Sequence, residues 1–174
     1  ETYIESTKDD NSYESKLRNE SNTAFPHKTS TWPLNDIKKV PYGNDMVCDF
    51  AKEALFSIIE NRYRLDYASI SVLDLFAGIG SISLEFASRG CKDVTSIEMN
   101  ARHAGFINAT ALELEMNSQV NAIRGEVFEY LKKNRNRKTY ELIVADPPFE
   151  MEIAKYEELI SLVLNNNYLK ENGV

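Results

Sequence analysis

Apolar residues follow two alternating patterns between residue 49 and the end of the chain. Short runs that are apolar at nearly every position are typical of parallel strands buried on both faces. Longer segments carry apolar residues at every third or fourth position, which is typical of helices with one buried face. The short runs predict strands at residues 71–77, 94–99, 120–124 and 141–145.

The longer segments predict helices at residues 50–61, 81–89, 101–116, 127–132 and 153–164. In the first of them, the spacing of a buried helical face is shown by Ala51, Ala54, Leu55, Ile58 and Ile59. Because strand and helix alternate four times, we expect an α/β fold with a mostly parallel sheet and helices on both of its faces.

The two ends of the chain differ from this pattern. Residues 1–45 are polar and poor in aliphatic side chains, which predicts an N-terminal extension that is partly disordered. Residues 46–174 are expected to form one domain. Residues 171–174 have the composition of a turn into a further strand, so we expect this domain to be truncated at its C-terminus.

Composition narrows the class of protein. The 174 residues carry a net charge of −7, which argues mildly against a large surface for nucleic-acid phosphates. No apolar run is long enough to span a bilayer, and the first residues do not form a secretion signal. The two cysteines, Cys48 and Cys91, do not have the spacing of metal ligands. We therefore expect a cytoplasmic monomer with no metal and no membrane partner.

A glycine-containing turn follows the first strand, in the segment Asp74-Leu75-Phe76-Ala77-Gly78-Ile79-Gly80. Glycine lets the backbone approach a ligand, and the next helix N-terminus favours negative charge such as a carboxylate. Glu98 ends the second strand, about 20 residues further along, where an acid can bind both hydroxyls of a ribose. Taken alone, the glycine turn also fits an ordinary tight turn between a strand and a helix, and Glu98 also fits a solvated residue at the end of a strand. Together they indicate an adenosine-like ligand.

The same turn helps to distinguish S-adenosylmethionine (SAM) from NAD. The dinucleotide fingerprint has a third glycine, and this chain has Ser83 at that position. SAM has no pyrophosphate and needs that glycine less, so the turn favours SAM as the cofactor.

Asp146-Pro147-Pro148-Phe149 follows the fourth strand. Consecutive prolines fix the backbone and remove two donors, which leaves carbonyl oxygens as acceptors. A carboxylate and carbonyls can accept the hydrogens of an –NH₂ group while the Phe149 ring stacks on a flat base. Such contacts would localise the nitrogen lone pair and aim it at the SAM methyl group. The alternative is a rigid loop with a buried phenylalanine.

Taken together, these motifs resemble the bacterial RsmD-type methyltransferases, which make N2-methylguanosine in small-subunit ribosomal RNA. The resemblance covers residues 49–174 and implies the Rossmann-like class I methyltransferase fold. It implies that the chain acts on ribosomal RNA or on the small ribosomal subunit particle. It also implies that the cofactor is held by Asp74, Phe76, Ala77, Gly78, Gly80, Glu98, Met99, Glu126 and Val127.

In the same way, the resemblance places the target amine on Asp146 and the Pro147 carbonyl, with Pro148 completing the loop and Phe149 stacking on the base. The family usually has Asp where this chain has Glu126. The N-terminal hairpin rich in Arg and Lys that is typical of the family is not recognisable in residues 1–45 of this chain.

Three other functions compete with this interpretation. An adenine-N6 methyltransferase shares the Asp-Pro-Pro-aromatic sequence, and a non-catalytic SAM-binding partner would keep the glycine turn. A NAD-linked oxidoreductase fits the sequence less well, because the third glycine of the dinucleotide fingerprint is missing. Two further features are interpreted as structural: the basic run at 132–138 as a solvated loop at the amino-terminal edge of the sheet, and His103 as a surface or half-buried helix residue.

Overall fold

The structure, a computed structural model, describes residues 49–174, so the predicted extension at 1–45 and Cys48 lie outside the described residues. One parallel sheet forms the centre of this part of the chain, with strand order β3-β2-β1-β4. Its strands are β1 (Ser71–Leu75), β2 (Asp93–Glu98), β3 (Val120–Arg124) and β4 (Leu142–Ala145). The four predicted strands are confirmed to within two residues at either end.

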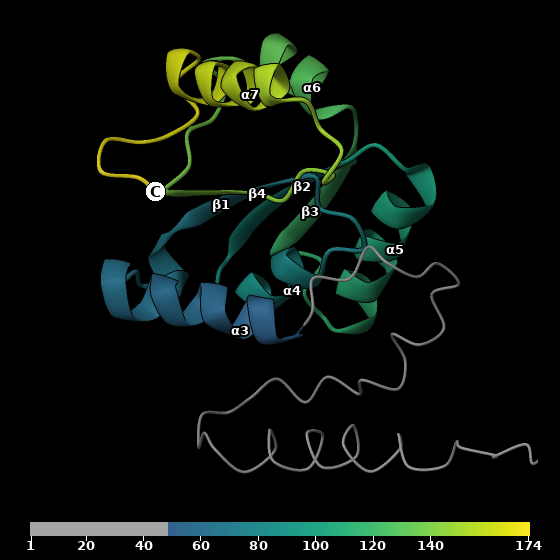
Figure 1. The fold of residues 1–174 in the computed structure, drawn as a ribbon. Coiled ribbons are helices and arrows are strands. Elements are labelled where there is room, and N and C mark those ends of the chain that lie inside the picture. Colours follow the sequence, from purple (N-terminus) through teal and green to yellow (C-terminus); the bar gives the residue numbers. More distant parts are fainter. Residues whose placement is uncertain (1–48) are drawn as a thin grey trace, which may run out of the picture. The chain divides into compact units, whose positions relative to one another are not determined.

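Helices cover both faces of the sheet, as predicted (Figure 1). One face carries α3 (Asp49–Ile58), α4 (Ser81–Ser88) and α5 (Ala101–Glu113), and the other carries α6 (Val127–Lys133) and α7 (Ile153–Asn165). Among these described helices, none has the length and apolar character needed to cross a membrane.

Alternation along the strands divides the core into two layers. Leu73 and Leu75 of β1 and Ile97 of β2 point to one layer, where they pack with Val127 and Leu131 of α6. On the other layer the rings of Phe56 and Phe86 lie 4.7 Å apart and join α3 to α4. Fully burying one such side chain contributes about 1.5–3 kcal/mol, so both layers hold the strand ends in place.

The first helix differs from its prediction in the face that it buries. Phe56 and Ile59 are buried, whereas Ile58, which we expected in the core, is 53% exposed. Packing of Phe56 against the tilted ring of Phe86, with the Arg89 guanidinium 4.3 Å from the Phe56 ring centre, selects this face. The helix then continues as one π turn (Ile59–Tyr63), and a short 3-10 turn (Tyr67–Ser69) leads into β1.

The last residues run along the free side of β4. The Val174 N–H donates to the Glu141 carbonyl at 2.9 Å, and the Ile143 N–H donates to the Val174 carbonyl at 2.8 Å. This is the pairing of a parallel strand. The turn before it is closed by a hydrogen bond from the Gly173 N–H to the Lys170 carbonyl, so the predicted turn at 171–174 leads to a position beside the sheet.

Candidate active site

The carboxyl ends of the parallel strands bring the predicted site residues to one edge of the sheet. Leu75 at the end of β1 is paired with Ile97 of β2 on one side and with Ala145 of β4 on the other. Phe76, Glu98 and Asp146 therefore leave the sheet side by side, although up to 70 residues separate them in the sequence. Ligands bind at this edge in open α/β sheets.

The turn after β1 is tight and has an unusual backbone. Phe76, Gly78 and Gly80 all have positive φ, at 64°, 56° and 81°. Positive φ is strained for a residue with a side chain such as Phe76. A Cβ atom on Gly80 would lie 2.6 Å from Cγ1 of Ile107, so this position requires glycine for both space and conformation.

Glu98 joins this turn to the end of β2. Its Oε2 atom accepts a hydrogen bond from the Gly78 N–H at 2.8 Å, and its Oε1 atom accepts one from the Asn100 N–H at 2.6 Å. A carboxylate oxygen has two lone-pair positions. Each oxygen of Glu98 can therefore still accept a ribose hydroxyl while the backbone contacts hold the carboxylate in place.

Asp74 lies beneath the turn and is almost completely buried. Its Oδ2 atom accepts a hydrogen bond from the Ser83 hydroxyl at 2.5 Å, and the Ser83 hydroxyl lies 2.6 Å from that of Ser96. Because Ser83 donates its one hydrogen to Asp74, Ser96 must donate to Ser83. Asp74 thus supports the start of α4 from below, and direct cofactor contact by its side chain stays a prediction.

The electrostatics of this edge are negative. Burial raises the pKa of Asp74 to about 7, hydrogen bonds from Ser83 oppose that shift, and the charges of Asp146 and Glu98 add to it. Three carboxyl groups therefore lie close enough to influence one another. Such an environment favours a cationic ligand over an anionic one.

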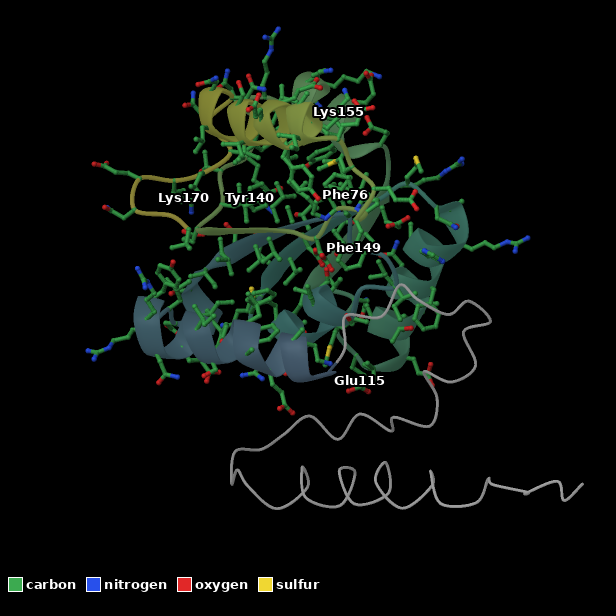
Figure 2. The ribbon with its side chains drawn as sticks, viewed as in Figure 1. Phe76, Glu115, Tyr140, Phe149, Lys155 and Lys170 are labelled. Carbon is green, nitrogen blue, oxygen red and sulfur yellow. The ribbon has the colours of Figure 1, made fainter. Side chains whose placement is uncertain are left out.

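The loop after β4 is open to solvent. Its start is tied to the sheet by a hydrogen bond from the Asp146 N–H to the Leu75 carbonyl at 3.4 Å, and Met151 N–H closes a turn on the Pro148 carbonyl at 3.0 Å. Phe149 is fully exposed, and Figure 2 shows it at the same end of the sheet as Phe76. An exposed Phe149 ring is available for stacking, which excludes the alternative of a buried phenylalanine.

The remaining predicted contacts lie around the start of α6. Both carboxylate oxygens of Glu126 cap this helix, accepting hydrogen bonds from the N–H groups of Phe128 and Glu129 at 3.1 and 2.8 Å. Val127 is buried in the core, whereas Met99 is exposed at the end of β2. The proposed places of Met99, Glu126 and Val127 beside an adenine stay predictions, and the geometry gives Glu126 a structural role as well.

His103 is half-buried on α5, as expected, and its Nδ1 lies 3.9 Å from Glu98 Oε1. The sequence analysis missed one residue of this region, Ser96. Ser96 completes the hydrogen-bond chain to Asp74. A polar residue in the middle of an otherwise buried parallel strand was the signal that could have drawn attention to Ser96. Within residues 49–174, no group of three or more His, Cys, Asp or Glu side chains is placed to hold a metal ion.

Comparison with known proteins assigns this fold to a class. The chain resembles a candidate methylase of Haemophilus influenzae of known crystal structure, with 32% identity and a TM-score of 0.60 over 72% of this chain and 74% of that one. A candidate methyltransferase complexed with SAH is 25% identical, with a TM-score of 0.57 over 70% of this chain and 33% of that chain. The fold is that of Rossmann-like, SAM-dependent methyltransferases.

The family follows from the sequence comparisons. Residues 46–174 match the family model described as Conserved hypothetical protein 95, and this chain belongs to that family. It is 30% identical to the ribosomal RNA small subunit methyltransferase D of Buchnera aphidicola, over 85% of this chain and 69% of that protein. It is 34% identical to the protein of the same name from Haemophilus influenzae, over 72% of this chain and 63% of that protein. The chain thus spans about two thirds of the length of these relatives.

Proposed function

We propose that this chain transfers the methyl group of SAM to the exocyclic amine of a base in ribosomal RNA, and specifically to guanine N2 in small-subunit RNA. One observation carries the proposal. The parallel sheet brings the glycine turn, Glu98 and the exposed Asp146-Pro147-Pro148-Phe149 loop to the same edge. Relatives of the same family are named for methylation of small-subunit ribosomal RNA.

The charge of the site supports SAM as the cofactor. SAM supplies an electrophilic methyl group on a positively charged sulfonium. Glu98 and Asp146 place negative charge at this edge, which favours that cation and disfavours the pyrophosphate of NAD. Glu98 would hold the ribose, and the turn from Phe76 to Gly80 would hold the methionine part through its backbone N–H groups.

The loop after β4 supports the choice of an amine as acceptor. In the proposed mechanism the Asp146 carboxylate and the Pro147 carbonyl accept the two hydrogens of the –NH₂ group, and Phe149 stacks on the base. The amine is a poor nucleophile while its lone pair is delocalised into the ring. Accepting its hydrogens would localise that lone pair and direct it toward the methyl group, in a geometry fixed by the two prolines. As the N–C bond forms, the bond from the methyl group to sulfur would break, S-adenosylhomocysteine would leave, and the nitrogen would release its extra proton to water.

The cellular setting is part of the proposal. We propose a cytoplasmic enzyme that acts as a monomer on ribosomal RNA or the assembling small subunit. The thiol of Cys91 is buried and free, which fits a reducing compartment.

The test is methyl transfer from labelled SAM to unmodified small-subunit RNA, followed by digestion and identification of the methylated nucleoside. N2-methylguanosine is the expected product. N6-methyladenosine would instead support the adenine-N6 alternative, which uses the same loop. SAM binding without any methylated nucleoside would overturn the proposal in favour of a non-catalytic SAM-binding partner.

A further inference from the structure

A hollow of about 540 Å³ lies at the amino-terminal edge of the sheet, away from the candidate active site. Its wall is formed by residues 68–71 before and at the start of β1, by Lys92 and Asp93 at the start of β2, by residues 136–139 before β4, and by Glu141 and Lys170. Figure 2 shows Lys170 toward one end of the sheet and Phe149 toward the other. No part of the proposed methyl transfer uses this hollow.

The hollow has an excess of positive charge. Four cations line it, and they are Lys92, Arg137, Lys138 and Lys170. Two carboxylates offset part of that charge: Lys138 Nζ lies 2.6 Å from Asp93 Oδ1, and Lys170 pairs with Glu141. Lys92 and Arg137 have no carboxylate partner in the part of the chain that the structure describes, so two positive charges are left for an external ligand.

The ion pairs Lys138–Asp93 and Lys170–Glu141 hold the walls of the hollow in place. Glu141 accepts hydrogen bonds from both the N–H and the hydroxyl of Ser71 at 2.7 Å, which ties Lys170 to the start of β1. Lys138 also donates to the Thr95 hydroxyl at 3.2 Å. The loop that carries Arg137 is thereby anchored near the start of two strands, and Arg137 is one of the residues that line the hollow.

The loop that carries Arg137 holds a further cation, so its local charge is positive although the net charge of the whole chain is negative. Arg135 is exposed and has no carboxylate partner among residues 49–174. Lys92, Arg135 and Arg137 therefore gather at one edge of a protein whose net charge is −7. A local excess of cations on an acidic protein favours a polyanion, and guanidinium groups suit phosphate oxygens through paired N–H donors.

We propose that this hollow binds phosphates of the RNA backbone at a distance from the base that is methylated. The proposal rests on the function proposed above. The five residues of β1 span about 17 Å, so phosphates held here belong to nucleotides other than the one stacked on Phe149. The hollow would thus position a folded RNA and would supply affinity that the acidic active-site edge cannot.

The experiment compares two double variants that each lower the net charge by two. In the first, Lys92→Gln and Arg137→Gln remove the two unpaired cations of the hollow. In the control, Arg62→Gln and Arg64→Gln remove exposed cations that do not line it. RNA affinity is measured at several salt concentrations with small-subunit RNA, and methyl transfer is measured at saturating RNA.

Each lost phosphate contact lowers the dependence of log K on log salt by about one. We expect the first double variant to lower that slope by about two and to weaken RNA binding about tenfold or more at moderate salt. The control should leave the slope unchanged. Transfer at saturating RNA should be the same in both, because the substituted residues lie away from the reacting atoms.

Two outcomes would overturn the inference. Equal slopes for the two double variants would show that the hollow makes no phosphate contact, and so would a wild-type chain that binds RNA without salt dependence. Failure of the proposed function would be seen in a different measurement. The wild-type chain would then form no methylated nucleoside, even if the salt slopes of the two double variants differed as expected.

Discussion

Glu98 accepts a hydrogen bond from the backbone N–H of Gly78, a residue 20 positions earlier in the chain, at 2.8 Å. The acid expected to bind the ribose is therefore also the residue that holds the glycine turn in place. This contact exists because β1 and β2 are adjacent parallel strands that end at the same level. It links the shape of the glycine turn to the position of the carboxylate.

Replacing Glu98 by Gln should weaken SAM binding more than it weakens the fold. The amide keeps the size of the side chain but removes its charge and one of its two acceptor oxygens, and a lost charged hydrogen bond costs about 1–3 kcal/mol. We expect SAM affinity, measured by calorimetry, to fall about tenfold to a hundredfold. Glu113→Gln, on the exposed side of α5, is the matched control and should bind SAM normally.

Replacing Asp146 by Ala should separate catalysis from cofactor binding. Its carboxylate is exposed at the edge where the amine is expected, so its loss removes an acceptor that acts on the substrate. We expect transfer of labelled methyl groups to fall by about two orders of magnitude or more, with little change in SAM affinity. Glu150→Ala, in the same loop, should transfer methyl groups normally. Normal transfer by Asp146→Ala would contradict the proposed mechanism.

Replacing Phe149 should weaken RNA binding and leave the stability of the fold unchanged. The ring is fully exposed, so Phe149→Ala should leave the free energy of unfolding within about 0.5 kcal/mol of the wild type. Stacking of a base on an aromatic ring contributes about 1–3 kcal/mol, and the Michaelis constant for RNA should rise accordingly. Phe149→Trp keeps an aromatic face and should retain most of the activity. A large loss of stability in Phe149→Ala would show that the ring packs on the protein.

Two glycines offer a matched pair for testing the turn. Gly80→Ala places a Cβ atom 2.6 Å from Ile107 Cγ1 at a φ of 81°, and such strain costs about 1–3 kcal/mol of unfolding free energy. Gly105→Ala introduces no contact within 4 Å in the middle of α5, and should stabilise the chain by about 0.5–1 kcal/mol. Urea unfolding measures both, and an equal effect of the two would contradict the geometry of the turn.

Asp74 should make stability depend on pH. Burial raises the pKa of this acid to about 7, above its ordinary value of about 4. The folded chain therefore holds a proton that the unfolded chain releases at lower pH. The stability linked to this proton is fully present below about pH 4 and is lost as the pH rises toward 7, at roughly 1 kcal/mol per pH unit.

Asp74→Asn mimics the protonated acid and should remove that part of the pH dependence. Urea unfolding between pH 4 and pH 8 measures it, and the variant should gain stability relative to the wild type as the pH rises. A difference between the two proteins that stays constant over this range would show that Asp74 is ionised in the folded chain.

Local patterns were enough to predict the elements. β1 and most of β2 are buried on both faces, β3 and β4 are buried in part, and Gly78, Gly80 and Gly90 interrupt the apolar pattern where the chain turns. The prediction was less accurate for α3, where several apolar residues compete for the core. Ile58 and Ile59 are neighbours with equal hydrophobicity, and only the packing of Phe56 on Phe86 decides that Ile59 is the buried one.

The sequence by itself determined the order of strands and helices along the chain, the glycine turn after the first strand, and the presence of Glu98 and the Asp146-Pro147-Pro148-Phe149 loop at strand ends. These follow from interactions between residues close in the chain. The tertiary structure decided the contact of Glu98 with Gly78, the burial of Asp74 on Ser83 and Ser96, and the gathering of Lys92, Arg137 and Lys170 around one hollow. Those relationships depend on which strands pair and in which register, and pairing between distant segments is set by the packing of the whole domain.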